Sequence, residues 1–280
     1  MRAFMRLWSG LLLVCFLAVF VSGAEAAPKS SKKKKKPYSV SARAAILIES
    51  DHLKRHYEKE ASRKVLPAST TKVMTAILVL EKLRLDQVVT VSQRAANALP
   101  SKLDIKPGET YRVRDLLYAI LLKSANDASV ALAEAVAGSE AKFVDMMNKR
   151  AVKLGAKHTR FANSHGLPTK AEQYTTAYDM ALIFREALKK SFFKEAIAQR
   201  YASITSREGR KISLKSHNSS LFKGWKQNVR GKTGYTNAAG ACFVGYLEHK
   251  KKLYIIAVFN SGSRWDDVKF IIERYTGADL

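Results

Sequence analysis

The chain has 280 residues, of which 47% are hydrophobic and 9% are aromatic. A chain of this length and composition can bury a substantial core, as one domain or as two lobes that share one cleft, so intrinsic disorder is not expected. The formal net charge of +25 at pH 7 favours polyanionic partners.

The first 26 residues have the pattern of a secretory signal peptide. Arg2 and Arg6 form a basic start, the apolar run 11–21 follows, and the Ala-Glu-Ala of 24–26 is a small-x-small cleavage site. A run of about 11 apolar residues is short of the ~20 that a membrane-spanning helix needs, although an uncleaved tether is an alternative. We therefore expect an exported, periplasmic or extracellular protein. Its polyanionic partners would then be envelope polymers or anionic lipid headgroups, and not nucleic acid.

Residues 27–41 are predicted to be a lysine-rich leader. The run from Lys32 to Lys36, which ends at Pro37, has no apolar face and should be solvated. This run either adds solubility alone or tethers the protein to anionic envelope polymers. Residues 42–280 are expected to form the catalytic domain.

The next segment predicts a hairpin followed by a helix. Residues 44–48 are apolar and compatible with a strand, and a polar stretch with Tyr57 follows, which indicates a hairpin at one edge of a sheet. From Ser69 to Leu83 there is no Pro or Gly, and apolar residues recur near helical spacing, which predicts a mostly buried helix. Further helical patterns cover 113–122, 127–137, 139–154 and 176–188.

From Lys211 onward the pattern returns to strands, notably 241–247 and 253–259, before a final helix from about Trp265. Cys242 is the single cysteine that remains after signal cleavage, and its apolar neighbours indicate a core residue and not a nucleophile. Strands at both ends with helices between them predict an α/β fold of the α+β type. In this fold an antiparallel sheet built from N- and C-terminal strands carries an inserted helical lobe.

A Ser-x-x-Lys sequence runs from Ser69 to Lys72 at the start of the first predicted helix. The same spacing begins at five other serines of this lysine-rich chain, so the sequence alone is weak evidence. Only Ser69 stands at the mouth of a long apolar helix, where backbone N–H groups attract an anion and the helix rise places Lys72 on the same side. A lysine accepts a serine proton only if desolvation and a second cation favour its neutral form. Ser69 is thus the candidate nucleophile and Lys72 its candidate base.

Two more motifs carry candidate cleft residues. The Ser-Ala-Asn sequence of 124–126 lies between two helical patterns, where Ser124 is either a cleft residue or an ordinary helix cap. The Ser-His-Asn of 216–218 repeats the pattern in a polar stretch that is expected to be exposed. The Lys-Thr-Gly of 232–234 occurs once, where the C-terminal strands begin. It is not a phosphate loop, because that loop needs a glycine where Lys226 stands and a helix afterward.

The three motifs, in this order and with these separations, resemble the active-site signature of penicillin-binding proteins and serine β-lactamases. The flanking residues are similar to those of the low-molecular-mass D-alanyl-D-alanine carboxypeptidases, over approximately residues 42–275. The segments that carry the resemblance are Pro67 to Thr75, Ser124 to Ala128, Asn163 through Gly166-Leu167, Thr176 to Met180 and Lys232 to Gly234.

The resemblance implies a serine-type carboxypeptidase that acts on peptidoglycan peptides ending in D-alanyl-D-alanine and is acylated by β-lactam antibiotics. Ser69 would form the acyl-enzyme, Lys72 would take its proton, and Ser124 would pass a proton to the leaving amine. The backbone N–H groups of Ser69 and Tyr235 would form the oxyanion hole. No cofactor or metal is implied.

The resemblance also implies the substrate-binding residues. Asn126 would hold the substrate amide, and Lys232 and Thr233 would bind the terminal carboxylate. Gly234 would let the substrate backbone lie against the strand as an added β-strand. Lys232 would in addition be the second cation beside the base. Ala125 replaces a glycine that is common in relatives, which is not expected to abolish activity.

The sequence is also compatible with other functions to different degrees. A β-lactamase of the common class needs a Glu-x-x-Leu-Asn loop, whereas Glu172 is followed by Gln-Tyr-Thr, so fast antibiotic hydrolysis is not expected. A D,D-endopeptidase that cuts peptide cross-links would use the same residues and stays open. A non-catalytic cationic scaffold that binds the cell wall is the alternative of another class. His165 is given no catalytic role.

Some carboxypeptidases continue into a β-domain and an amphipathic membrane helix. Membrane attachment by that route is not expected for a chain ending at Leu280.

Overall fold

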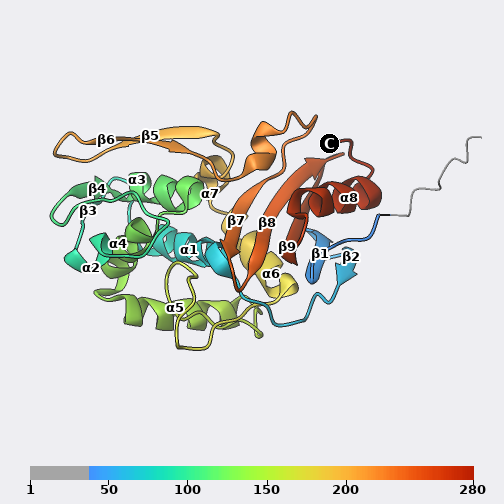
Figure 1. Ribbon diagram of the computed structural model, residues 1–280, viewed down its shortest axis with the longest axis horizontal. Coiled ribbons are helices and arrows are strands. Elements are labelled where there is room, and N and C mark those ends of the chain that lie inside the picture. Colours follow the sequence, from blue (N-terminus) through green and yellow to red (C-terminus); the bar gives the residue numbers. More distant parts are fainter. Residues whose placement is uncertain (1–37) are drawn as a thin grey trace, which may run out of the picture. The chain divides into compact units, whose positions relative to one another are not determined.

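The computed structural model describes residues 38–280, so the predicted signal peptide and most of the predicted leader, including Lys32–Lys36, lie outside the described residues. A five-stranded sheet in the order β2-β1-β9-β8-β7 forms its centre, and every pairing in it is antiparallel (Figure 1). The strands are β1 (Ala44–Glu49), β2 (Arg55–Lys59), β7 (Arg230–Thr236), β8 (Gly240–His249) and β9 (Lys252–Ser261). N- and C-terminal strands therefore share one sheet, which confirms the predicted fold class.

Both faces of this sheet are covered. In β1, Ile46 belongs to the core beneath the helical lobe, whereas its neighbour Leu47 belongs to the core beneath the C-terminal helix α8 (Arg264–Thr276). Successive residues of a strand point to opposite faces, so two apolar layers produce the unbroken apolar run of β1. Figure 1 shows α8 on one side of the sheet, with α6 and α1 on the other.

The helical lobe is inserted between β2 and β7, as the sequence predicts. Its first helix begins as a short 3-10 turn, η1 (Ala68–Thr71), which continues into the buried helix α1 (Lys72–Lys82). The pattern predicted over 113–122 is an α-helix that loosens into a π-helical turn before Ser124. The remaining helical elements are α2 (Gln93–Ala96), α3 (Val113–Tyr118), η2 (Ala119–Lys123), α4 (Asn126–Ala137), α5 (Glu140–Lys153), α6 (Ala177–Leu188), α7 (Ser191–Ala196) and η3 (Ser219–Phe222).

Two small hairpins accompany the lobe. Strand β3 (Val88–Thr90) pairs with β4 (Thr110–Arg112), and β5 (Tyr201–Thr205) pairs with β6 (Lys211–Lys215). Between the predicted N-terminal hairpin and Lys211 the sequence indicates no strand, so β3, β4 and β5 were missed. The β5–β6 hairpin is a separate sheet that projects beside the lobe (Figure 1). Most of its side chains are exposed, which leaves a weak apolar pattern.

A buried carboxylate fixes the start of the described chain. Asp267 in α8 accepts hydrogen bonds from the Tyr38 hydroxyl at 2.6 Å, the Ser41 backbone N–H and hydroxyl, both at 2.8 Å, the Ala42 N–H at 2.8 Å and the Ser261 hydroxyl at 2.6 Å. Residues 38–41, at the end of the predicted leader, therefore pack against α8. Across residues 38–280, no helix combines the length and the apolar character that crossing a bilayer requires.

Candidate active site

The first motif forms a compact arrangement at the start of α1. Ser69 lies in η1 and is half-buried, whereas Lys72, the first residue of α1, is completely buried. The Lys72 Nζ donates to Ser69 Oγ at 3.1 Å, to Asn126 Oδ1 at 2.7 Å and to the backbone oxygen of His165 at 2.9 Å. A neutral amine has two N–H donors and one lone pair. If Asn126 and His165 take the two donors, the lone pair faces the Ser69 hydroxyl.

The electrostatics of the site favour this neutral form. Burial, and after it the positive charge of Lys232, hold the pKa of Lys72 well below the usual lysine value, and Asp127 opposes this only in part. Burial and the nearby Arg264 guanidinium lower the pKa of Lys232 to about 7. Burial and a neighbouring cation both destabilise the ammonium form, so the neutral amine of Lys72 is favoured.

The second motif lies between η2 and α4. Ser124 adopts the left-handed conformation (φ 62°), and its Oγ accepts a hydrogen bond from Lys232 Nζ at 3.0 Å. Asn126 is the first residue of α4, and its Nδ2 donates to the Leu99 oxygen at 2.8 Å while its Oδ1 accepts from Lys72. Both ends of the Asn126 amide are therefore engaged in this structure.

The third motif lies in β7, at the edge of the sheet. Lys232 is buried, and its Nζ bridges Ser124 Oγ and the Thr233 backbone oxygen, the latter at 2.9 Å. Thr233 is buried, whereas Tyr235 is 64% exposed. Strand β7 runs along η1, so all three predicted motifs meet at one site.

Two glycines allow this close approach. A Cβ on Gly234 would lie 3.1 Å from the Ser69 backbone nitrogen, so the strand passes directly beside this N–H group. Gly166 has φ +89°, and a Cβ there would overlap the Ala68 carbonyl. The loop around Gly166 therefore packs against Ala68 and Thr71, and the edge of β7 packs against Ala68 and Ser69. Both segments contact the short turn that carries Ser69.

Two groups at the site were not predicted. The His165 backbone oxygen contacts Lys72, and a backbone acceptor leaves no residue-type signal in a sequence. Arg264, the first residue of α8, donates from Nη1 to the Gly234 oxygen at 3.2 Å and to the Cys242 oxygen at 3.0 Å, which places a positive charge behind β7. No motif surrounds Arg264 in the sequence.

The expectation that 216–218 is exposed was wrong for two of its three residues. Ser216 and Asn218 are buried, and only His217 is exposed. Asn218 donates to the Val229 oxygen at 3.0 Å, so its amide fixes the connection that leads into β7. By contrast Cys242 is fully buried, as predicted, and burial raises the pKa of its thiol to about 11.

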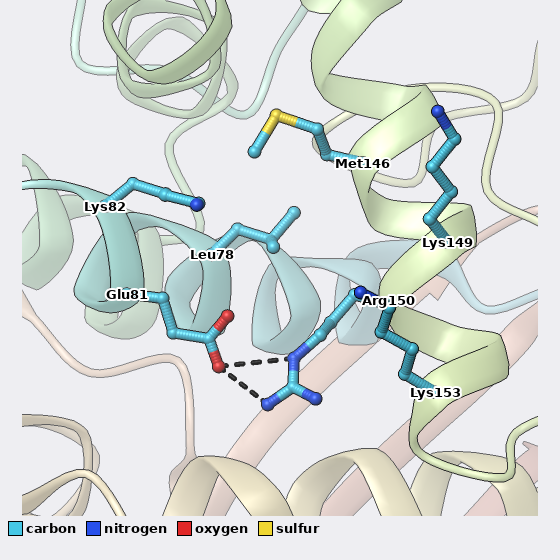
Figure 2. A pocket seen from close by; sticks show the side chains of 7 residues that line it. All are labelled: Leu78, Glu81, Lys82, Met146, Lys149, Arg150 and Lys153. Atoms are coloured by element: carbon cyan, nitrogen blue, oxygen red, sulfur yellow. Dashed lines mark hydrogen bonds and ion pairs between the residues drawn. The ribbon is translucent and has the colours of Figure 1, made fainter.

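A cavity of about 350 Å³ lies away from these motifs, between the C-terminal part of α1 and α5 (Figure 2). Its single carboxylate, Glu81, is paired with Arg150 at 2.7 Å. None of the motif residues lines this cavity, which is formed by Leu78, Glu81, Lys82, Met146, Lys149, Arg150 and Lys153.

Residues 30–263 match the family described as D-alanyl-D-alanine carboxypeptidase, Peptidase_S11. The chain belongs to this family. Among curated relatives it is 35% identical over 263 residues to the D-alanyl-D-alanine carboxypeptidase DacF of Bacillus subtilis. That alignment covers 92% of this chain and 67% of the relative. It is 34% identical over 269 residues to the D-alanyl-D-alanine carboxypeptidase DacC of Escherichia coli, and this alignment covers 91% of this chain and 64% of the relative.

Solved structures of the family have the same fold. A D-alanyl-D-alanine carboxypeptidase from Mycobacterium tuberculosis matches with a TM-score of 0.80 and 27% identity, over 88% of this chain and 96% of that one. A mutant of a Streptomyces DD-transpeptidase matches with a TM-score of 0.79 and 26% identity, over 87% and 100% of the two chains. The chain spans about two thirds of the length of the two curated carboxypeptidases named above.

Proposed function

We propose that this chain is a serine-type D-alanyl-D-alanine carboxypeptidase that acts on peptidoglycan stem peptides through an acyl-enzyme on Ser69. One observation carries the proposal: the completely buried Lys72 amine lies 3.1 Å from Ser69 Oγ and has acceptors for its other hydrogens. Family membership supports the same reaction class.

In the first half of the reaction, Ser69 Oγ attacks the carbonyl carbon of the penultimate D-alanine and Lys72 takes the hydroxyl proton. The backbone N–H groups of Ser69 and Tyr235 stabilise the oxyanion. The C–N bond then breaks, and Ser124 gives its proton to the leaving amine of the terminal D-alanine. Lys72 restores that proton, and water subsequently hydrolyses the ester and regenerates Ser69.

Substrate binding uses the free edge of β7. A peptide that adds as a strand beside Gly234 gains backbone hydrogen bonds and brings its terminal carboxylate toward Lys232 and Thr233. Arg264 adds positive charge from behind the strand. The Asn126 side chain contacts the substrate amide, which requires it to exchange its bond with Leu99 or to share its carbonyl with Lys72.

The same residues would serve a D,D-endopeptidase, which differs only in the form of the peptide that enters. β-Lactamase activity has less support, because within residues 38–280 no carboxylate hydrogen-bonds to Ser69 or Lys72, and Glu172 is exposed. The shared reactive group of both peptidases makes β-lactams acylating inhibitors of the chain.

Export to the cell envelope is part of the proposal. The wall peptide lies outside the cytoplasm, and residues 1–26 have the pattern of a signal peptide. The run Lys32–Lys36 would then face anionic envelope polymers and hold the enzyme near its substrate.

The test is to incubate the purified protein with wall pentapeptides and with cross-linked peptide dimers, and to analyse products by mass. A carboxypeptidase removes one alanine from the pentapeptide, whereas splitting of dimers indicates the endopeptidase. The matched control is Ser69→Ala, which should abolish both products. A wild-type protein that binds wall material and leaves both peptides intact would establish the non-catalytic scaffold instead.

A further inference from the structure

We propose that Glu140 is a positioning residue for Lys72, and that it acts by fixing the Ser164–His165 segment whose backbone oxygen holds the Lys72 amine. This inference rests on the proposed function, because it concerns the base of that reaction. Glu140 lies on a different element from all three motifs, at the first position of α5.

The path from Lys72 leads first to a single carbonyl group. His165 O accepts from Lys72 Nζ at 2.9 Å, so the position of this oxygen sets where the amine lies relative to Ser69. The preceding residue, Ser164, is completely buried, and its own oxygen accepts from Thr75 Oγ1 at 2.6 Å and from Ser129 Oγ at 2.8 Å. The segment is therefore attached to α1 and α4 at consecutive carbonyls.

Glu140 holds this segment through the donors of Ser164. Its Oε1 accepts from both the backbone N–H of Ser164, at 3.0 Å, and the Ser164 hydroxyl, at 2.7 Å. Its Oε2 accepts from Arg94 Nη2 at 3.1 Å. Hydrogen bonds to a carboxylate are about twice as strong as those between neutral groups. One side chain thus fixes both donors of the residue next to the Lys72 acceptor.

The charges around Glu140 are consistent with a permanent anion. Although burial opposes it, the hydrogen bonds that Ser164 and Arg94 donate hold the pKa of Glu140 below its usual value. Burial and the charge of Lys72 lower the pKa of His165 to about 4, and its Nε2 lies 3.8 Å from Glu140 Oε1. At neutral pH the His165 ring is therefore uncharged, and Glu140 acts through hydrogen bonds to Ser164 and not through an ion pair with His165.

A cavity of about 340 Å³ opens beside this carboxylate, between α5 and the loop that carries Ser164. Its wall carries two cations, Arg94 and Arg160, together with the carboxylates of Glu140, Asp145 and Glu172. A small carboxylate from solution can therefore reach the space that a truncated Glu140 side chain would leave. There it can accept the hydrogen bonds of the Ser164 N–H and hydroxyl, which lose their acceptor in the variant.

The test measures the rate constant of acylation by a chromogenic β-lactam in Glu140→Ala, Glu140→Gln and Ser139→Ala. Glu140→Ala should acylate about 10- to 100-fold more slowly, because a misplacement approaching 1 Å costs about 10²-fold, while the affinity of the initial complex stays unchanged. Glu140→Gln keeps an acceptor for Ser164 and should retain most of the rate. Ser139→Ala removes the N-cap of the same helix, whose Oγ accepts from Lys142 N at 3.3 Å, and should acylate like wild type.

Acetate in solution should restore acylation of Glu140→Ala in a saturable manner, whereas chloride at equal ionic strength should not. The inference is overturned if Glu140→Ala acylates as fast as wild type, if Ser139→Ala loses as much, or if acetate leaves the Glu140→Ala rate unchanged. Failure of the wild-type protein to acylate at all would instead contradict the proposed function, so the two failures are distinguishable.

Discussion

Gly166 gives a sharp test of how the Ser69 turn is supported. Gly166→Ala and Gly209→Ala place the same methyl group at two positions with similar left-handed backbones, φ +89° and φ +94°. At Gly209, in the β5–β6 turn, the new Cβ meets nothing within 4 Å. At Gly166 it lies 1.8 Å from the Ala68 carbonyl oxygen, 2.5 Å from the carbonyl carbon and 2.7 Å from Thr71 Oγ1. The pair therefore separates backbone strain from displacement of the active-site turn.

The expected magnitudes follow from these distances. Both variants lose about 1–2 kcal/mol because alanine is strained in the left-handed region. Ordinary carbon contacts are about 3.5–4.0 Å, so Gly166→Ala must move its loop and the Ala68–Thr71 turn apart by at least about 1 Å. Such overpacking costs about 1–3 kcal/mol more in stability, and a 1 Å misplacement of the reacting groups costs about 10²-fold in rate.

Stopped-flow acylation with a chromogenic β-lactam, together with urea denaturation, measures both effects. Gly209→Ala should acylate like wild type despite its lower stability, whereas Gly166→Ala should acylate about 10²-fold more slowly under conditions where it remains folded. Equal acylation rates in the two variants would refute the idea that the loop at Gly166 sets the position of the Ser69 turn.

Three further predictions concern charge, the base and the fold. Because burial and Arg264 lower the pKa of Lys232 to about 7, kcat/KM should fall above about pH 7 as Lys232 in the free enzyme loses the charge that binds the substrate carboxylate. Protonation of Lys72 should also lower kcat/KM, because the ammonium form cannot accept the Ser69 proton. A pH–rate profile without the alkaline fall would contradict this role of Lys232. Asn126→Ala removes an acceptor of Lys72 and should slow β-lactam acylation about 10²-fold, and an unchanged rate would show that this bond does not position the amine. Asp267→Ala leaves buried donors unpaired and should lower the free energy of unfolding by about 3 kcal/mol in urea denaturation while acylation stays normal; an unchanged unfolding midpoint would contradict it.

Patterns of apolar residues were sufficient to predict the main architecture. The helix predicted from Ser69 to Leu83 is present, and its apolar residues are buried at nearly every turn. The strands β1, β8 and β9 are buried on both faces, which gives each of them a nearly unbroken apolar run in the sequence. The β5–β6 hairpin escaped prediction because it buries only alternate, widely spaced side chains such as Ile204 and Leu214. Periodicity therefore reports burial, and lightly buried elements give little signal.

The sequence indicates those groups of the candidate site that are side chains within motifs, and it does not indicate the groups that belong to the backbone. The motifs led us to propose Ser69, Lys72 and Lys232 as site residues, because their residue types fit the chemistry. The His165 oxygen was missed, because any residue supplies a carbonyl, and so was Arg264, which lies outside every motif. The burial of 216–218 was misjudged because its polar groups bond to backbone atoms such as the Val229 oxygen, which the sequence does not reveal.

The protonation state of Lys72 is the most direct test of the account. NMR titration of the lysine side chains, with the Lys72 signal assigned from a Lys72→Arg spectrum, would measure the pKa of this amine in the free protein. The account predicts a value well below that of ordinary lysines, and a higher value when Lys232→Met removes the neighbouring charge. A Lys72 that titrates with the surface lysines would contradict its role as the base for Ser69.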